Sequence, residues 1–230
     1  MYKESFLMAW ASLVANKLRS LLTMLGIIIG VAAVIALVSI GNGVKQDIEN
    51  SISSLGSNLL VVLPGAPRTP GARPSQGSMK SLKISDYEAI AKLEGVKAAS
   101  PMTNGSYVVI YQNKNWTTSV AGVNSNFQDV NNWTMTSGRF FSDKNVQNRE
   151  RVAVVGQTVV KNLFADEDPV GKEIRVKNIP FRVIGVLKSK GNGTMGNDQD
   201  DTVLIPYTTS MERVEGIDYL RRVYVVAKDD

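Results

Sequence analysis

An uncharged apolar run near the start of the chain constrains the fold more than any other feature. Between Ser20 and Gly43 the sequence has no charged residue, and residues 21–40 are apolar apart from Thr23 and Ser39. A helix of this length spans about 30 Å at about 1.5 Å per residue, which matches the hydrocarbon core of a bilayer. The run therefore predicts a transmembrane helix over residues 21–43.

Two other roles fit this run less well. A cleaved signal peptide has an apolar region of about 7–15 residues after a short basic start. Here the apolar region is longer, and residues 1–20 precede it. The third interpretation, a buried core helix, rarely needs so many consecutive uncharged positions. Both stay as alternatives to the transmembrane helix.

Charged residues beside the run predict its orientation. Lys17 and Arg19 lie one turn before it, whereas Lys45 after it is followed by acidic residues. Because positive charge favours the cytoplasmic side, we expect the N-terminus in the cytoplasm of a cell-membrane protein. The residues after 43 are then extracytoplasmic.

The first 20 residues show a helical pattern of their own. Large apolar or basic side chains recur there at spacings of three and four, at Phe6, Trp10, Leu13, Val14, Lys17, Leu18 and Leu21. Such a helix, with an aromatic anchor and basic residues, lies in the membrane interface. Residues 1–20 are therefore predicted as an interfacial amphipathic helix, with Trp10, Lys17 and Arg19 at the interface.

Small residues within the run predict a packing face. Gly26 and Gly30 form a G-x-x-x-G step, and Ala33 continues the same face. Small residues let two membrane helices approach closely, although glycine and alanine are also common in such helices. Further along, Gly41 and Gly43 interrupt a helical apolar pattern, and we interpret them either as a hinge of a stalk or as a helix boundary.

The remainder of the chain predicts a mixed α+β fold with mostly antiparallel pairing. Short helices are expected from about residue 85 to 93 after a capping box, and over 159–164 and 208–214. A buried strand is expected over residues 58–63. Further strands are expected over residues 106–112, 117–123, 151–155, 173–176, 181–187, 202–205 and 222–226.

The composition excludes several classes of chemistry. The chain has no Cys and no His, which excludes a disulfide scaffold, a thiolate zinc site and Ser-His-Asp or Cys-His catalysis. The net charge of +5 is mild, and no basic run with interleaved aromatic residues points to nucleic acid.

Two polar motifs also indicate no ligand. The stretch from Gly191 to Gly196 matches G-x-G-x-x-G, but the helical periodicity that a dinucleotide site requires does not follow it. Asp198, Asp200 and Asp201 lack the spacing of a calcium loop, so we expect a solvated turn. We therefore predict no catalytic residue, no cofactor, no metal ion and no enzymatic activity.

Two blocks of the sequence together resemble a known family. The first is "NKLRSLLTMLGIIIGVAAVIALVSIGNGVKQDI", and the second is "ERVAVVGQTVVKNLF" with "DPVGKEIRVKNIPFRVIGVLKSKG" and "DDTVLIPYTT". Both are similar to permease subunits of MacB-type ABC transporters, within the FtsX superfamily. The similarity covers nearly the whole chain.

The resemblance implies a domain plan and partners. An extracytoplasmic core domain would occupy residues 44–230, with a porter-like lobe and an inserted β-rich lobe at roughly residues 124–190. Members act as homo- or heterodimers, and several work with a membrane-fusion-type adaptor. Their ATPase moves the membrane helices, which push the outer domain. Because the sequence starts at the interfacial helix, the resemblance implies a separate ATPase subunit, and it also implies three further membrane helices after the outer domain.

We therefore expect a permease subunit that couples cytoplasmic ATP hydrolysis to movement of an extracytoplasmic domain for export or efflux. The alternative is a single-pass, membrane-anchored binding or sensor module. No charged or aromatic cluster of the sequence selects a cargo.

Overall fold

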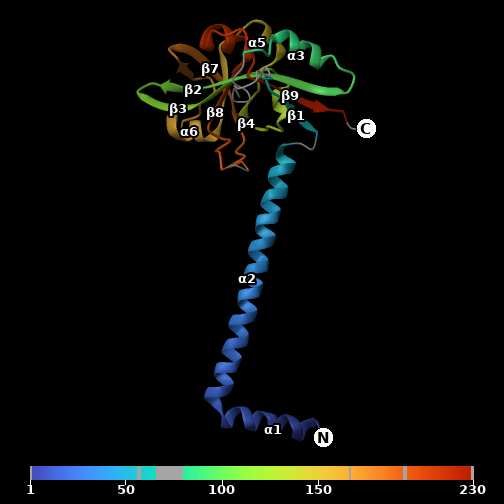
Figure 1. Cartoon of the computed structure of the whole chain (residues 1–230). Coiled ribbons are helices and arrows are strands. Elements are labelled where there is room, and N and C mark those ends of the chain that lie inside the picture. The colour runs from blue at the N-terminus through green and yellow to red at the C-terminus, as the bar shows by residue number, and fades with distance from the viewer. Residues whose placement is uncertain (1, 56–57, 66–79, 166, 194–195, 229–230) are drawn as a thin grey trace, which may run out of the picture. The chain divides into compact units, whose positions relative to one another are not determined.

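The computed structural model describes residues 2–55, 58–65, 80–165, 167–193 and 196–228. It divides into two units, residues 1–50 and 51–230. The first is called here the N-terminal unit and the second the C-terminal domain, and each is described by itself (Figure 1).

Two helices make up the N-terminal unit. Helix α1 runs over Tyr2–Ala15, and helix α2 begins at Lys17 and continues over Lys17–Leu55, so that its last residues belong to the C-terminal domain. Lys17 and Arg19 thus lie in the first turn of α2. Helix α2 continues through Gly41 and Gly43 without interruption.

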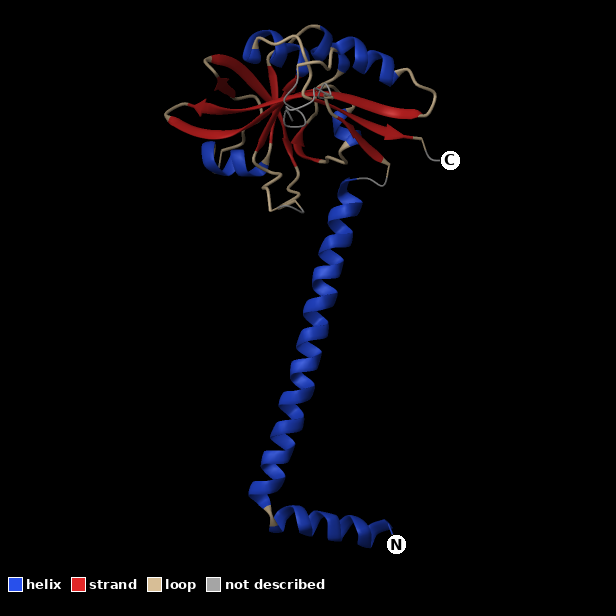
Figure 2. Cartoon of the chain, in the orientation of Figure 1, coloured by secondary structure: helices blue, strands red, loops and turns tan. Residues whose placement is uncertain are grey.

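The C-terminal domain is built on a mixed sheet (Figure 2). Within the described residues the sheet has nine strands in the order β1-β9-β2-β3-β8-β5-β7-β4, and β6 pairs with β2 and β7. The strands are β1 Leu59–Val62, β2 Val96–Tyr111, β3 Lys114–Val123, β4 Met135–Gly138, β5 Val152–Val155, β6 Glu173–Val176, β7 Ile179–Leu187, β8 Thr202–Pro206 and β9 Arg222–Ala227.

Strand pairing is mostly antiparallel, as the short strands of the sequence predict. The pairs β3–β8 and β5–β7 are parallel, and the other pairs are antiparallel. Strand β2 pairs with β9 and then with β3 along its length, and β6 pairs with it near its end. Its residues from 96 to 102 pair with β9, and those from 103 to 111 pair with β3. One long strand therefore joins both parts of the sheet.

Short helices complete the C-terminal domain. They are α3 Ile84–Ala91, α4 Phe127–Val130, α5 Asp143–Gln147, α6 Gln157–Leu163 and α7 Tyr207–Thr209, and α7 continues into a π-helix, η1 Ser210–Glu215. Helix α3 begins at Ile84, and its N-cap is Lys83 instead of the predicted Ser85, because the Asp86 carboxylate accepts a 2.8 Å hydrogen bond from the Lys83 N–H. The missed helices α4 and α5 are one turn each, too short for a periodic pattern.

Three apolar clusters form the core. The first surrounds Val109, Phe164 and Phe181 between α6 and the strands β2, β5, β6, β7 and β8, and the second surrounds Phe127, Val154 and Leu187. The third packs Leu220 with its neighbours from β2, β9 and the segment before α3. Successive residues of β5 belong alternately to the first and the second cluster, because side chains alternate between the two faces of a sheet.

One sequence expectation about burial is wrong. The segment 58–63 does form a strand, β1, but Leu60 is 59% exposed and Val61 is 46% exposed. Strand β1 stands at the end of the sheet order, with β9 as its neighbour. An apolar sequence reports strand propensity but not whether a strand lies at the centre or the edge of a sheet.

Candidate functional site

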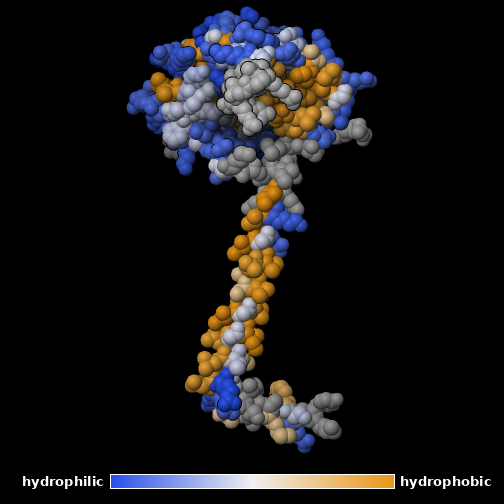
Figure 3. All heavy atoms as spheres, viewed as in Figure 1, coloured by the Kyte–Doolittle hydropathy of each residue, from blue (hydrophilic) through white to orange (hydrophobic). Residues whose placement is uncertain are grey.

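An exposed apolar helix is the dominant functional feature of the N-terminal unit. The 30 residues Lys17–Gln46 are long and apolar enough, by length and composition, to cross a membrane, and none of their most apolar stretch is buried in the structure. Figure 3 shows this apolar surface along α2. Water is a poor solvent for so long an apolar surface, whereas a helix in lipid satisfies every backbone group internally.

The predicted packing residues lie on this exposed helix. Residues at positions i, i+4 and i+7 share one helix face, which places Gly26, Gly30 and Ala33 together. A Cβ atom built at Gly26 or at Gly30 would have no described atom within 4 Å. The face is therefore open to a second helix, and its role in packing stays a prediction.

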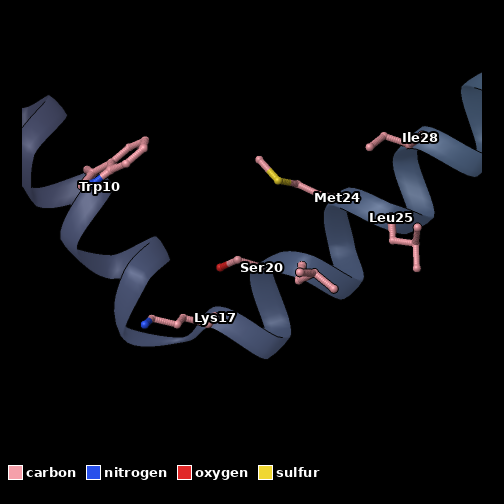
Figure 4. A pocket seen from close by; sticks show the side chains of 7 residues that line it. Trp10, Lys17, Ser20, Met24, Leu25 and Ile28 are labelled. Atoms are coloured by element: carbon pink, nitrogen blue, oxygen red, sulfur yellow. The ribbon is translucent and has the colours of Figure 1, made fainter.

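The predicted interface residues are divided by the elbow between α1 and α2. Trp10 and Lys17 line the same hollow, a cavity of about 680 Å³, together with residues of α2 that include Ser20, Met24 and Ile28 (Figure 4). Arg19 is not part of this lining. The structure thus brings together two of the three residues that the sequence singles out.

The two predicted hinge residues lie within α2. Space for a side chain is open at both Gly41 and Gly43, since no described atom lies within 4 Å of a Cβ built there. Neither glycine is therefore required by close packing inside the N-terminal unit. Glycine lowers helix stability by about 1 kcal/mol relative to alanine, so the pair marks a weak point of α2.

The G-x-G-x-x-G stretch belongs to a loop. Asn192 and Asp198 form an isolated antiparallel bridge, and Gly191 and Gly196 have φ angles of +72° and +74°. Strand β8, beginning at Thr202, follows the loop instead of a helix. A dinucleotide site needs a helix N-terminus at this point. Thr194 and Met195 lie outside the described residues.

The three neighbouring aspartates hold this loop in place. Asp200 accepts hydrogen bonds from the Ser189 hydroxyl and from the Lys190 and Gly191 N–H groups, the latter two at 2.8 and 3.1 Å. The expectation of a solvated turn is wrong for Asp200, which is only 5% exposed. The carboxylate is buried because three donors satisfy it.

The two neighbours of Asp200 are also engaged by the fold. The Asp198 carboxylate accepts a 2.6 Å hydrogen bond from the Thr158 hydroxyl, and the Asp201 carboxylate accepts one of 2.8 Å from the Trp116 indole. Within the described ranges, no group of three or more acidic residues is arranged to hold a metal ion. These carboxylates therefore have structural partners.

A buried polar network, called here the switch network, lies where β2 changes partner. The Thr103 and Ser210 hydroxyl oxygens are 2.8 Å apart, and the Ser210 hydroxyl donates to the Glu215 carboxylate at 3.1 Å. Glu215 is 2% exposed at its side chain, and its second oxygen lies 3.5 Å from the Arg221 guanidinium. This ion pair is too long for a good hydrogen bond, so the carboxylate oxygen is incompletely satisfied.

The switch network also affects a neighbouring tyrosine. Burial raises the pKa of Tyr107 above its usual 10.0, and the negative charge of Glu215 raises it further. The sequence did not single out these residues, because Thr103 and Ser210 are 107 positions apart. Ser210 and Glu215 lie in the π-helix η1. Such helices are often found at functional positions, but so short a segment has no periodic pattern by which the sequence could reveal one.

Comparison with known proteins confirms the resemblance. Residues 20–230 match the family described as MacB-like periplasmic core domain. The macrolide export ATP-binding/permease protein MacB of Chlorobium luteolum is 41% identical over 218 residues, covering 94% of this chain and 33% of that protein. The protein of the same name from Rhodospirillum rubrum is 45% identical over 230 residues, covering 99% of this chain and 35% of that protein. The chain spans about a third of the length of these curated relatives.

Solved structures show the same fold. The periplasmic region of MacB from Actinobacillus actinomycetemcomitans matches with a TM-score of 0.66 at 28% identity, over 78% of each chain. The extracellular domain of the noncanonic ABC-type transporter YknZ from Gram-positive bacteria matches with a TM-score of 0.62 at 21% identity, over 75% of this chain and 84% of that chain. The second match bears on the fold alone.

The apolar helix α2 precedes a mixed domain of this fold, and the family match covers nearly all of the chain. The predicted α+β fold class and the predicted family are both confirmed. The arrangement fits a membrane protein with an extracytoplasmic domain. The chain therefore belongs to the MacB-like periplasmic core domain family of MacB-type transporters.

Proposed function

We propose that this chain belongs to the permease subunit of a MacB-type ABC transporter, in which ATP hydrolysis in the cytoplasm moves an extracytoplasmic domain during export or efflux. One observation carries the proposal: an exposed helix that can cross a membrane precedes a domain with the fold of a MacB periplasmic region. The relatives named above are described as macrolide export proteins, and their cargo is no part of the proposal.

The proposed topology follows from charge. Lys17 and Arg19 precede the apolar run, and this positive charge supports a cytoplasmic N-terminus with the C-terminal domain outside. Helix α1 would lie in the membrane interface, with Trp10 as its aromatic anchor. The proposed domain plan keeps residues 1–20 at the interface, residues 21–43 across the membrane and residues 44–230 outside.

The length of α2 supports a mechanical role. Its 39 residues extend over about 58 Å at about 1.5 Å per residue, roughly twice the hydrocarbon thickness of a bilayer. A displacement of its membrane part is therefore transmitted along one continuous helix to residues beyond the bilayer. We propose that Gly41 and Gly43 set where this helix bends under load.

Two lobes are proposed for the C-terminal domain. Strands β4, β5, β6 and β7 all fall at roughly residues 124–190, the range proposed as the inserted β-rich lobe. The apolar cluster around Leu220 supports a second, porter-like lobe, because its residues come from other parts of the domain. In this proposal the C-terminal domain transmits movement and performs no catalysis.

The proposed partners follow from this mechanism. ATP hydrolysis requires an ATPase, which we propose as a separate cytoplasmic subunit, and the open Gly26 and Gly30 face suits a homo- or heterodimer of permeases. An adaptor of the membrane-fusion type is a further proposed partner of the C-terminal domain.

Purification of the full-length protein from native membranes tests the proposal. We expect an ATPase polypeptide of separate mobility on a denaturing gel, and nucleotide hydrolysis by the eluate. A mock purification from untagged cells provides the background. If the affinity-tagged protein hydrolyses nucleotide when no second polypeptide is present in the eluate, a separate ATPase subunit is contradicted. Repeated recovery without any ATPase would contradict the transporter and favour the anchored binding module.

A further inference from the structure

We propose that the elbow between α1 and α2 is a binding site for one anionic phospholipid, whose headgroup meets Lys17 and whose acyl chain lies along α2. This inference rests on the membrane placement of the proposed function and goes beyond it. The site is the cavity of about 680 Å³ described above, which falls in the range of about 300–1,000 Å³ typical of ligand sites.

The walls of the cavity suit an acyl chain. Met24 and Ile28 follow Ser20 at intervals of four residues, so they continue one face of α2 for about 12 Å beyond Ser20. Figure 4 shows these side chains and Trp10 of α1 directed toward the space between the two helices. Trp10 is 62% exposed and Ile28 is 63% exposed, so the apolar atoms of both walls are available to a ligand.

The part of the cavity beside the start of α2 suits an anionic headgroup. Lys17 and Ser20 line it where the chain turns from α1 into α2. From Ser5 to Gln46 the charged residues are Lys17, Arg19 and Lys45, all of them basic. A lysine on its flexible stem can reach the headgroup level of a bilayer, while the tryptophan indole combines an apolar ring with a polar N–H.

Charge complementarity selects the occupant. A ligand that fills this hollow must offer an apolar chain beside Met24 and Ile28 and a negative group beside Lys17. A phospholipid with a net negative headgroup has both parts in one molecule. A second apolar helix in the same place would cover the walls but would offer no negative group to the Lys17 ammonium. We therefore prefer the lipid, and a helix is an outcome of the test.

Quenching of Trp10 fluorescence tests the site. The full-length protein is reconstituted into phosphatidylcholine vesicles that contain increasing mole fractions of phosphatidylglycerol brominated on its acyl chains. The same titration of Trp10→Phe is subtracted, so that only the Trp10 signal remains. We expect quenching to saturate at a low mole fraction of the brominated anionic lipid, and brominated phosphatidylcholine to give weaker quenching that does not saturate.

Matched variants identify the headgroup contact. Lys17→Gln should raise the mole fraction needed for half-maximal quenching about fivefold, which corresponds to about 1 kcal/mol for one basic residue at an anionic surface. Arg19→Gln removes the same charge two positions away, outside the cavity lining, and should shift the midpoint much less. Lys17→Arg should retain the midpoint of the parent protein.

A second pair of variants tests the apolar wall. Met24→Phe enlarges a lining residue and should lower the quenching reached at saturation, because less of the acyl chain fits. Ile27→Phe enlarges a side chain outside the lining and should leave that level unchanged. Both substitutions keep an apolar residue on an exposed helix surface, so insertion into the membrane is retained.

Each other outcome overturns the inference. If Lys17→Gln and Arg19→Gln shift the half-maximal mole fraction equally, the protein is attracted to the anionic bilayer surface in general and has no specific site at Lys17. Quenching by neither lipid, with protein still recovered in the vesicles, would place Trp10 away from acyl chains, as an occupying helix would. If the protein does not insert into the vesicles at all, the membrane placement of the proposed function fails with it, and that failure is distinguished by flotation of the vesicles.

Discussion

A Cβ atom at Gly122 would lie 2.4 Å from the Cβ of Ser210, a distance that real Cβ atoms do not reach. The absence of a side chain at Gly122 lets β3 lie directly against the residues of the switch network. The Thr103 hydroxyl is also close, at 2.5 Å from the same position. The junction between β2, β3 and η1 therefore has no room for a side chain at Gly122.

Gly122→Ala should destabilise the C-terminal domain by about 1–3 kcal/mol, because the neighbours are short buried side chains that cannot rotate away. Urea unfolding of the variant measures this as a lower midpoint. Gly95→Ala is the matched control, since a Cβ there meets no described atom within 4 Å. Equal midpoints for the two variants would contradict the close packing at Gly122.

Glu215→Gln should cost more stability than Glu212→Gln, although each glutamate pairs with an arginine. Glu215 is 2% exposed at its side chain and receives the Ser210 hydroxyl, whereas Glu212 is 50% exposed and pairs with Arg149 at 2.9 Å. We expect roughly 1–3 kcal/mol for the buried network and at most about 1 kcal/mol for the surface pair. Denaturant unfolding at neutral pH compares them, and a larger loss for Glu212→Gln would refute a structural role of the network.

Alkaline pH should destabilise the C-terminal domain through Tyr207. Burial raises the pKa of Tyr207 above 10.0, and the nearby Tyr87 and Glu88 charges raise it further. The folded state therefore keeps a proton that the unfolded state releases, so this stability is complete below pH 10.0 and is lost as the pH rises above it. Tyr207→Phe should reduce the loss between neutral pH and about pH 11 in unfolding experiments. An unchanged pH slope would show that other groups cause it.

Gly26→Leu combined with Gly30→Leu should weaken association between membrane helices, because the larger side chains hold the backbones apart. Ile27→Leu with Val31→Leu is the control, with the same spacing on another part of α2. Cross-linking in membranes measures the dimer fraction. If both pairs give the parental fraction, the open glycine face is not an interface.

Gly41→Ala with Gly43→Ala should stiffen α2. Each replacement favours the helix by about 1 kcal/mol, and space for the new methyl groups is open. If these glycines are the bending point of the proposed transporter, transport per ATP hydrolysed should fall while the amount of protein in the membrane stays constant. Unchanged coupling would indicate that the glycines are an ordinary part of the helix.

The local sequence pattern was sufficient to predict some helices and strands of the protein. The uncharged run predicted an apolar helix because a single property extends over many consecutive residues, and the segments of β5 and β7 were predicted as strands from their local sequence. The order of the strands was not predicted, since pairing depends on contacts between residues far apart in the sequence.

The candidate sites show the same division. The sequence singled out Trp10 and Lys17, which both line the elbow cavity, but it gave no reason to separate them from Arg19. Their separation depends on α2 beginning at Lys17, a boundary that periodicity does not fix to one residue. The burial of Asp200 was missed because its donors come from backbone groups that only the folded loop brings together.

The sixteen-residue strand β2 has a consequence for how the C-terminal domain can deform. Its backbone is hydrogen-bonded to β9 on one stretch and to β3 on the next, so neither half of the sheet can slide without stretching the same piece of chain. A force applied to the part of the sheet that contains β9 therefore also acts, through β2, on the part that contains β3. The two parts of the sheet are therefore tied together by a single uninterrupted backbone, at the point where Met102 pairs with β9 and Thr103 pairs with β3.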